Sequence, residues 1–558
     1  MSNLTSLQWI RTEYQPRLPS ILNAYLSLVP KLHPQLQSRE LEASLKALFP
    51  LTQSAPIITF EKKPVQDHPK LKIGVVLSGG QAPGGHTVIA ALFDAAKQFH
   101  PDSELIGFKN GPSGIVKNAF IRLDNEKIAP FRNQGGFDLL GSGRTKIETP
   151  EQFEAAYQTV KSHDLDGLVI IGGDDSNTNA AFLAEYFAKK ESKTIVCGVP
   201  KTIDGDLKND FIELSFGFDT ASKVYSEIIG NLLIDAKSSA KYYFFIKIMG
   251  RSASHLALEC ALQTHPNLTL ISEEIAKKNQ NLHEVIEEIA LLICQRAEEG
   301  KNYGGILIPE GIIEFIPDFK MLVNELNLIL KSATSGGEEF AALAEQLKLS
   351  YLKSKLTANS FDCLLQFPAE VQKQLLLDRD PHGNVQVSKI ETERLFISLV
   401  EKRLSDWRKE GKYKGAFSPQ PFFCGYEGRS ALPTNFDCNY CYSLGILSAL
   451  IIRWKLNGYM ACINNLAESA SEWEILTVPL CQMIHQENRE GKWKAVIQKS
   501  LVNLNDPPFL SFDQEREEWR LKDHYCTPGP IQFSGNEQIA DKPPLSLLYM
   551  NEMKQLQK

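Results

Sequence analysis

Short apolar runs that alternate with helical segments are the feature that most constrains the fold of this chain. Residues 72–77, 168–171 and 194–199 are rich in Val and Ile, and each run leads into glycine, proline or polar residues. The spacing predicts helices between these runs, at 151–163 and 177–190. Strands connected through helices have right-handed crossovers and form a mostly parallel sheet. The pattern therefore predicts the α/β class.

A second group of elements follows the first and predicts a second α/β unit. The strands are expected at 242–248 and 305–308, and the helices at 255–264 and 283–299. A further strand is expected at 104–108 in the first group. The two groups together indicate two α/β domains in one chain.

Composition limits the class of protein. The chain has 558 residues, of which 43% are hydrophobic and 23% charged, with a net charge of −7. These values are ordinary for a globular protein, and the acidic balance argues against a general nucleic-acid binder. There is no apolar run long enough for a membrane helix, and we expect no signal peptide. We therefore expect a cytoplasmic protein that binds no membrane and whose ten cysteines are reduced thiols.

Gly172-Gly173-Asp174-Asp175 follows an apolar strand and is the most informative motif for function. A glycine pair at the carboxyl end of a strand lets the backbone approach a ligand closely. Two carboxylates beside a phosphate ligand make sense if one holds Mg²⁺ and the other controls which phosphate compound enters. The motif therefore predicts a metal-assisted phosphate site.

Two more glycine-rich loops suggest phosphate binding. Residues 78–85 lie between a strand and a helix, where backbone N–H groups and the helix N-terminus favour an anion. No Gly-Lys-Ser/Thr follows, so this is not a Walker A loop, and the dinucleotide pattern is absent too. Arg144 in a second glycine loop can bridge two phosphates. The alternatives are a tight turn without a ligand and a surface arginine.

Pro200-Lys-Thr-Ile-Asp-Gly-Asp206 follows the strand at 194–199 and combines a lysine with two carboxylates. One carboxylate can accept a proton from a hydroxyl, and the other can bind Mg²⁺ directly or through water. Lys201 can neutralise charge on a transferring phosphoryl group. The alternative is a solvated acidic turn.

Two other strand ends and one segment before a helix have polar residues that suit a phosphorylated sugar, because glutamate accepts from hydroxyls and arginine binds phosphate. These are Met249–Arg251, Pro309–Gly311 and Tyr426–Arg429. Alone, each is equally explained as a turn or a surface charge.

Two motifs favour structural roles. Cys438 and Cys441 have CxxC spacing, but no second CxxC pair exists, so we expect two cysteines packed at the start of a helix rather than a zinc or redox site. The charged segment 389–403 has little apolar stripe, and we expect it to be a solvated helix face.

Taken together, the motifs resemble the phosphofructokinase superfamily, and in detail its long, pyrophosphate-dependent type. The resemblance covers roughly residues 70–470 and implies two Rossmann-like three-layer α/β/α domains, an N-terminal extension and a helical insertion. The matching segments, in family order, are SGGQAPGGH (78–86), GGDDSNTNA (172–180), PKTIDGDL (200–207), KYYFFIKIMGRSASHLALECALQTHPN (241–267), PEG (309–311) and YEGRSALPTNFDCNYCYSLG (426–445).

The resemblance implies a role for each matched position. Asp204 would be the general base, with Asp206 and Arg251 also catalytic, and Asp174 would belong to the Mg²⁺ site. Asp175 and Lys201 would set donor specificity, since ATP-using relatives have a small residue at both positions. Pyrophosphate would be held by Gly79, Gly80, Arg144 and Gly173. Fructose 6-phosphate would be held by Thr202, Ile203, Asp204, Lys241, Tyr242, Met249, Gly250, Arg251, Glu310, Tyr426, Glu427, Gly428 and Arg429.

The activity implied by the resemblance is reversible, glycolytic transfer of a phosphoryl group from pyrophosphate to the 1-hydroxyl of fructose 6-phosphate. The products would be fructose 1,6-bisphosphate and phosphate. Lys241 and Tyr242 match a segment that reaches the sugar of a neighbouring subunit, so a homodimer is expected. The alternatives are an ATP-dependent phosphofructokinase, a catalytically silent regulatory subunit of the same fold, and an unrelated sugar-phosphate isomerase or binding module.

The expected organisation has five parts. We expect residues 1–70 to be helical and polar, residues 316–415 to be a helical insertion with a turn at 380–384, and the tail after residue 505 to be loop-like. The expected boundaries are an extension at 1–70, a pyrophosphate and Mg domain at 71–235, a fructose 6-phosphate domain at 236–315 and 416–470, an insertion at 316–415, and a C-terminal segment at 471–558 packed on the core.

Overall fold

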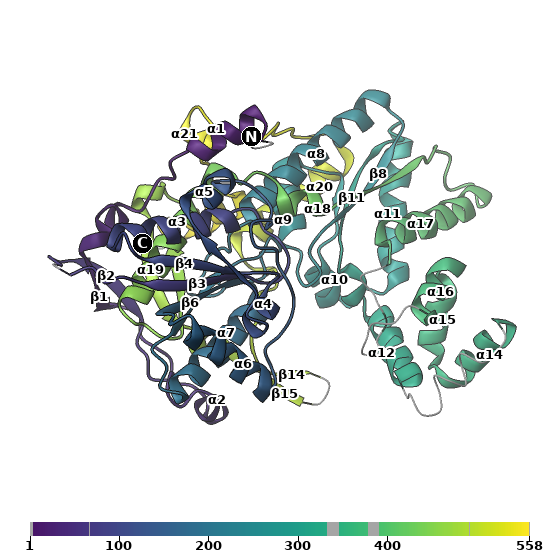
Figure 1. Ribbon diagram of the computed structural model, residues 1–558. Helices are drawn as coiled ribbons and strands as arrows, with labels where there is room; N and C mark the ends of the chain where they lie inside the picture. Colours follow the sequence, from purple (N-terminus) through teal and green to yellow (C-terminus); the bar gives the residue numbers. More distant parts are fainter. Residues whose placement is uncertain are drawn as a thin grey trace. The chain divides into compact units, whose positions relative to one another are not determined.

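The computed structural model describes residues 4–65, 67–331, 345–377, 385, 390–489 and 492–556. The chain forms two compact units (Figure 1). Unit 1 comprises residues 1–224, 426–500 and 531–551, and unit 2 comprises residues 225–425, 501–530 and 552–558. Each unit is described by itself.

Unit 1 is built on a nine-stranded sheet in the order β1-β2-β13-β12-β7-β6-β3-β4-β5. The five central strands are parallel neighbours, and antiparallel strands complete both edges. The strands are β1 Leu28–Leu32, β2 Ile58–Lys62, β3 Lys72–Leu77, β4 Glu104–Phe108, β5 Phe120–Leu123, β6 Gly167–Gly172, β7 Ile195–Pro200, β12 Tyr459–Asn464 and β13 Glu474–Pro479. The predicted strands of this unit are confirmed, each to within one residue.

Helices cover both faces of this sheet (Figure 1). Leu168 and Ile170 of β6 pack in one core with α6 (Pro150–Ser162) and α7 (Asp174–Lys189). Intervening residues of a strand point to the opposite face, which α3 (Gly85–Phe99) and α19 (Asn435–Arg453) cover. Strands buried on both faces read as continuous apolar runs, which is why they were visible in the sequence.

The N-terminal extension differs from the expectation. It contains the short helices α1 (Ser6–Glu13) and α2 (Ala43–Leu48), but also β1 and β2, and β2 pairs with β13. The expectation of an all-helical extension was wrong because the partner of β2 lies about 400 residues away, beyond the reach of any local pattern.

Unit 2 has a four-stranded parallel sheet in the order β11-β8-β10-β9. Its strands are β8 Tyr243–Ile248, β9 Leu268–Thr269, β10 Gly304–Pro309 and β11 Pro419–Cys424. The predicted helices are present as α9 (His255–Thr264) and α11 (Leu282–Glu298). The two Rossmann-like α/β units expected from the sequence are therefore confirmed.

The insertion is helical, as predicted, in the part of it that the structure describes. Its helices are α12 Pro317–Lys331, α14 Glu345–Lys355, α15 Ala358–Gln366, α16 Ala369–Leu377 and α17 Thr392–Lys409. The turn expected at 380–384 lies outside the described residues. Helix α17 does carry an apolar stripe, because Phe396, Val400 and Trp407 are buried in the core of unit 2. The expectation of a merely solvated helix was wrong here.

The tail also contains regular structure, contrary to the loop expected after residue 505. Helix α20 (Pro507–Leu521) starts with prolines in its first turn, where the missing N–H costs nothing. The remaining elements are α4 Pro112–Val116, α5 Asn125–Ile128, α8 Phe218–Ser239, α10 Ser272–Lys278, α18 Tyr426–Ser430, α21 Glu537–Ala540, α22 Leu545–Leu556, β14 Ile484–Arg489 and β15 Lys492–Ile497.

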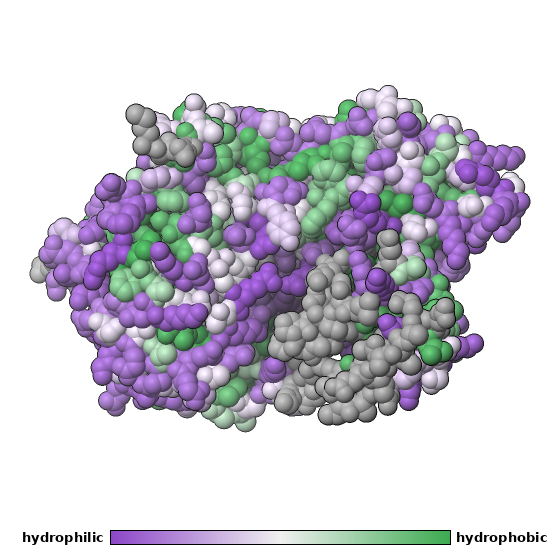
Figure 2. All heavy atoms as spheres, turned by 45° about the vertical axis from the view of Figure 1, so that its right-hand side comes forward, coloured by the Kyte–Doolittle hydropathy of each residue, from purple (hydrophilic) through white to green (hydrophobic). Residues whose placement is uncertain are grey.

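Hydrophilic side chains cover much of the face shown in Figure 2. Among the described residues, no helix combines the length and the apolar character that crossing a membrane requires.

Candidate functional site

Three predicted motifs meet at one edge of the sheet of unit 1. Because β3, β6 and β7 are parallel neighbours, their carboxyl ends lie together. Ser176 donates to the hydroxyl of Ser78 at 2.7 Å, and the backbone N–H of Lys201 donates to the carbonyl of Gly172 at 2.9 Å. The glycine loop, the Gly-Gly-Asp-Asp motif and the Lys-Thr-Ile-Asp-Gly-Asp loop are therefore brought together.

Lys201 is a buried positive charge of this group. Its side chain is buried, and its ammonium donates to the carbonyl of Gly80 at 2.7 Å. Burial lowers the pKa of Lys201 to about 8, and the carboxylates, first of all Asp204, oppose that shift. Arg429 adds to the lowering, so two cations lie close to the same loop.

A guanidinium lies close against the glycine loop. A Cβ at Gly80 would lie 2.1 Å from Nη2 of Arg429, and Gly79 has a φ of +85°, which favours glycine. Arg429 is in α18, and its guanidinium lies 5.6 Å from the ring centre of Tyr426. Sequence reasoning assigned Arg429 to the sugar phosphate. Its guanidinium lies against the loop assigned to pyrophosphate, and which substrate it binds stays a prediction.

A cluster of carboxylates stands beside this loop. Asp174 and Asp175 are the first two residues of α7, after Gly173, which caps the helix. Burial raises the pKa of Asp174, and the neighbouring charges of Asp175 and Asp206 raise it further, against the lowering effect of Lys499. Asp175 is exposed and pairs with Lys146 at 3.0 Å.

Hydrogen bonds hold the predicted base in its loop. The backbone N–H of Asp204 donates to the hydroxyl of Thr202 at 3.1 Å, and that hydroxyl donates to Asp206 at 3.3 Å. Ile203 and Asp206 are both buried, and each is 5% exposed. One threonine hydroxyl therefore links the backbone of Asp204 to the carboxylate of Asp206.

Lys499 is a functional candidate that sequence reasoning missed. Its ammonium lies 3.2 Å from Oδ2 of Asp206 and 4.0 Å from Oδ2 of Asp174. Burial by itself would lower the pKa of Lys499, but Asp206 and Asp174 outweigh it and raise the pKa. No local signal could have found this residue, because it is an isolated lysine just after β15 in the C-terminal part of the chain.

The carboxylates fit the requirements of Mg²⁺ when phosphate is also present. No cluster of three or more His, Cys, Asp or Glu side chains suited to a metal occurs in the described part of the chain. Mg²⁺ is usually bound through one or two carboxylates together with substrate phosphates rather than by a complete protein cage. Asp174 and Asp206 satisfy that pattern, because both are within reach of one cation, the ammonium of Lys499.

Unit 2 brings together two more of the predicted motifs, because β8 and β10 are neighbours. The N–H of Gly250 donates to Oε2 of Glu310 at 3.2 Å. A Cβ at Gly311 would lie 1.9 Å from the carbonyl oxygen of Arg251. The N–H of Met249 donates to the carbonyl of Cys424 in β11 at 2.9 Å. Glu310 and the segment 249–251 thus form one polar group at the strand ends.

The other predicted residues differ in their exposure. Arg144 is exposed and follows Gly143, whose carbonyl accepts from the N–H of Gly79 at 2.9 Å. In unit 2, the ammonium of Lys241 lies 5.1 Å from the ring centre of Tyr242, just before β8. In α18, Tyr426 and Glu427 are exposed and Gly428 is buried.

The two cysteines of the CxxC spacing are packed in a helix, as predicted. Cys438 and Cys441 are buried free thiols near the start of α19. Burial raises the pKa of Cys438 to about 11, which makes it a poor nucleophile.

The fold and the residues at its strand ends define a class of protein. Residues 72–365 match the phosphofructokinase family model, and the chain belongs to this family. The family expected from the motifs is therefore confirmed.

Curated relatives give a more particular likeness. A protein of Porphyromonas gingivalis, named pyrophosphate--fructose 6-phosphate 1-phosphotransferase, is 47% identical over 97% of this chain and 98% of its own length. Subunit beta 2 of the enzyme of that name in Arabidopsis thaliana is 48% identical over 95% of this chain and 92% of its own. The alpha subunit from Solanum tuberosum is 38% identical over 99% of this chain and 91% of its own.

A solved structure supports the fold. The crystal structure of a pyrophosphate-dependent phosphofructokinase from Nitrosospira multiformis matches with a TM-score of 0.53 and 15% identity, covering 84% of this chain and 96% of that one. At this identity the likeness concerns the fold alone.

Proposed function

We propose that this chain catalyses reversible phosphoryl transfer from pyrophosphate to the 1-hydroxyl of fructose 6-phosphate. The products are fructose 1,6-bisphosphate and phosphate, and the reaction belongs to glycolysis. The observation that carries the proposal is the ammonium of Lys201 on the carbonyl of Gly80. It places a buried positive charge inside the glycine loop, where a compact anion such as pyrophosphate binds.

The choice of donor rests on Asp175 together with Lys201. A nucleotide would extend beyond the second phosphate toward the N-terminus of α7, where the carboxylate of Asp175 would repel its α-phosphate. Pyrophosphate ends before that point and is attracted by Lys201. The pair thus favours the small donor and rejects the large one.

Asp204 is the proposed general base. It takes the proton from the 1-hydroxyl as that oxygen attacks the phosphorus atom, and the bond to the leaving phosphate breaks. Thr202 holds the backbone of Asp204 and the carboxylate of Asp206 at the same time, so the loop that carries the base is ordered before the substrate arrives.

Asp174 and Asp206 would hold Mg²⁺, assisted by oxygens of pyrophosphate. When bound, Mg²⁺ neutralises negative charge on the transferring phosphoryl group. Lys201 and Arg144 add positive charge around the donor.

The sugar phosphate is assigned to the strand ends of unit 2. The carboxylate of Glu310 accepts from sugar hydroxyls, and the guanidinium of Arg251 binds a phosphate. Lys241 and Tyr242 are proposed to reach the sugar phosphate held by a second copy of the chain, which makes the protein a homodimer. We place the enzyme in the cytoplasm, where its sugar phosphates are found.

The test is product formation from fructose 6-phosphate and Mg²⁺, with pyrophosphate or ATP as donor in parallel. Product with pyrophosphate alone is expected. Product with ATP alone would overturn the role of Asp175 and Lys201, and product with neither donor would favour a silent regulatory subunit.

A double variant tests the proposed donor selection directly. Asp175→Gly with Lys201→Gly removes both the repulsion and the buried charge, so measurable ATP use should appear while pyrophosphate use falls. Asp164→Gly, at an exposed position of unit 1, is the matched control and should leave donor preference unchanged. Continued complete exclusion of ATP by the double variant would contradict the proposed donor selection.

A further inference from the structure

Lys499 occupies a place that the assigned chemistry does not explain. Its ammonium contacts Asp206 at 3.2 Å and approaches Asp174 at 4.0 Å, and these are the two carboxylates proposed to hold Mg²⁺. Both carboxylates are largely buried, with side chains 7% and 21% exposed. Buried carboxylates need a counter-charge, and in the free protein Lys499 supplies it.

The backbone around Lys499 cannot withdraw easily. The N–H of Ser500 donates to the carbonyl of Asp206 at 2.7 Å, and the N–H of Ile497 donates to the hydroxyl of Thr178 at 2.9 Å. The side chain of Ile497 is 1% exposed and belongs to the core of unit 1. Lys499 is therefore tethered on both sides, and its ammonium stays within reach of Asp174 and Asp206.

A divalent cation on either carboxylate would stand about 2 Å from its oxygen. The cation would then face the ammonium of Lys499, which lies against the same carboxylates. At such close range the positive charges of the metal ion and the ammonium repel each other strongly. Pyrophosphate changes this balance, because its oxygens offer ligands to the metal and a new anionic partner to the lysine.

We propose that Lys499 is the counter-cation of Asp174 and Asp206 in the free enzyme, so that the divalent cation enters with pyrophosphate rather than alone. This inference rests on the proposed metal role of these two carboxylates. It makes Lys499 a positioning residue that sets the order in which metal and donor bind.

The experiment measures binding of Mn²⁺ to the full chain by electron paramagnetic resonance, first without any substrate. The unaltered protein should bind Mn²⁺ weakly, and Lys499→Met should bind it at least about tenfold more tightly, because the competing charge is gone. Lys499→Arg keeps the charge and should behave like the unaltered protein. Lys494→Met is the matched control, since Lys494 is an exposed lysine of β15.

The second arm adds pyrophosphate, which should raise Mn²⁺ affinity strongly in the unaltered protein and little in Lys499→Met. Equal Mn²⁺ affinities of the two proteins without pyrophosphate would overturn the role of Lys499 and leave the proposed reaction standing. Absence of Mn²⁺ binding under both conditions would overturn the metal role of the carboxylates as well. If Lys499→Met fails to fold, as judged by circular dichroism, Lys499→Gln provides the same comparison.

Discussion

At the scale of single residues, the environment of each charge decides what it can do. Lys201 and Asp204 lie in one loop, yet Lys201 is buried against Gly80 while Asp204 is held through Thr202. The proposed roles of Lys201 as a donor-binding cation and of Asp204 as the base lead to separate predictions.

Asp204→Asn should lower kcat by roughly 10²–10⁴-fold, because the amide keeps the shape of the side chain and cannot accept the proton. The KM for fructose 6-phosphate should change little. Steady-state kinetics with pyrophosphate as donor checks this, and Asp210→Asn, which removes one carboxylate from an exposed position of the same connection, serves as the matched control. Near-normal turnover of Asp204→Asn would refute the assignment of the base.

The pKa of Lys201, lowered to about 8 by burial, predicts a pH dependence. Below this value the side chain is protonated and attracts pyrophosphate, and above it the charge is lost. The kcat/KM for pyrophosphate should therefore fall as the pH rises through about 8. In Lys201→Arg the guanidinium stays charged, so the fall should move to higher pH. If Lys201→Arg has the same pH profile of kcat/KM as the unaltered protein, a group other than Lys201 causes the fall.

At the scale of elements, strand ends and inserted helices position the polar groups. In unit 2 the loops after β8 and β10 touch through their backbones, with Gly311 against Arg251. An inserted helix, α17, also packs on this sheet.

Gly311→Ala should displace the backbone of Arg251, since the added Cβ would lie 1.9 Å from its carbonyl oxygen. Backbone cannot move aside as the end of a flexible side chain can, so we expect a higher KM for fructose 6-phosphate with little change for pyrophosphate. Gly300→Ala is a comparison that strains the backbone without a steric clash, because Gly300 has a φ of +77° and nothing lies within 4 Å of its Cβ position. Equal kinetics of the two variants would contradict this reading.

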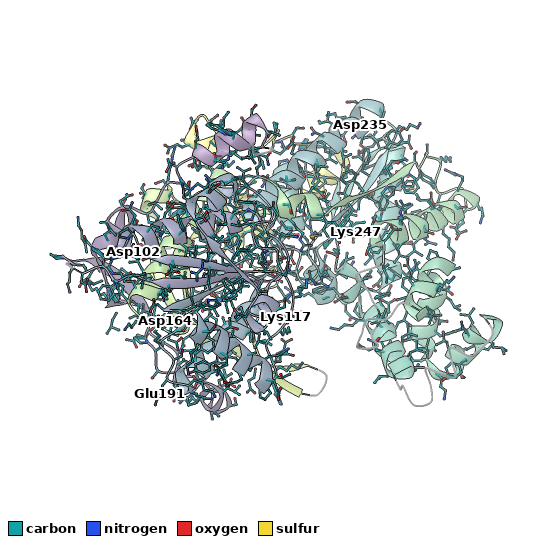
Figure 3. All side chains as sticks on the ribbon, in the orientation of Figure 1. Asp102, Lys117, Asp164, Glu191, Asp235 and Lys247 are labelled. Atoms are coloured by element: carbon teal, nitrogen blue, oxygen red, sulfur yellow. The ribbon has the colours of Figure 1, made fainter. Side chains whose placement is uncertain are left out.

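A buried ion pair links β8 to α17. Lys247, labelled in Figure 3, lies 2.9 Å from Glu393, and both side chains are less than a tenth exposed. Glu393→Gln leaves the ammonium without its partner and should lower the free energy of unfolding by about 3–5 kcal/mol. Lys247→Met combined with Glu393→Leu should cost much less, because no charge remains buried. Denaturant unfolding measures the free energy of unfolding of the single and the double variant. An equal loss of stability in the two would argue against a buried ion pair between Lys247 and Glu393.

At the scale of the whole molecule, distant parts of the chain meet at the start of α19. Arg11 donates to Asn435 at 2.7 Å and to the carbonyl of Pro433 at 3.0 Å. Its guanidinium also lies 4.4 Å from the ring centre of Phe533 in the C-terminal part of unit 1. The N-terminal extension and the tail thus hold the same helix end.

Arg11→Met should lower the free energy of unfolding by roughly 2–4 kcal/mol, because the buried acceptors at the start of α19 lose their donor. Arg17→Ala, whose side chain is 45% exposed in a surface ion pair, should cost under about 1 kcal/mol. Thermal unfolding of both variants compares them. Equal decreases in the unfolding temperature of the two variants would show that Arg11 does not anchor the start of α19.

The α/β class, the central strands and the residues at their carboxyl ends could be predicted from the amino-acid sequence. Those features are local, because buried parallel strands such as 72–77 read as apolar runs and their loops carry glycine and carboxylates in short motifs. The family resemblance added the general base Asp204 and the donor pair Asp175 and Lys201 as predictions.

Only the tertiary structure decided which residues from distant parts of the chain meet. The strand β2, the buried Arg11 and the proposed counter-cation Lys499 have no local signature, because β13, Asn435 and Asp206, which they contact, lie hundreds of residues away. A lone lysine looks the same in a sequence whether it faces water or two buried carboxylates. Long-range packing brings Lys499 beside Asp206, and that position alone gives its charge a role.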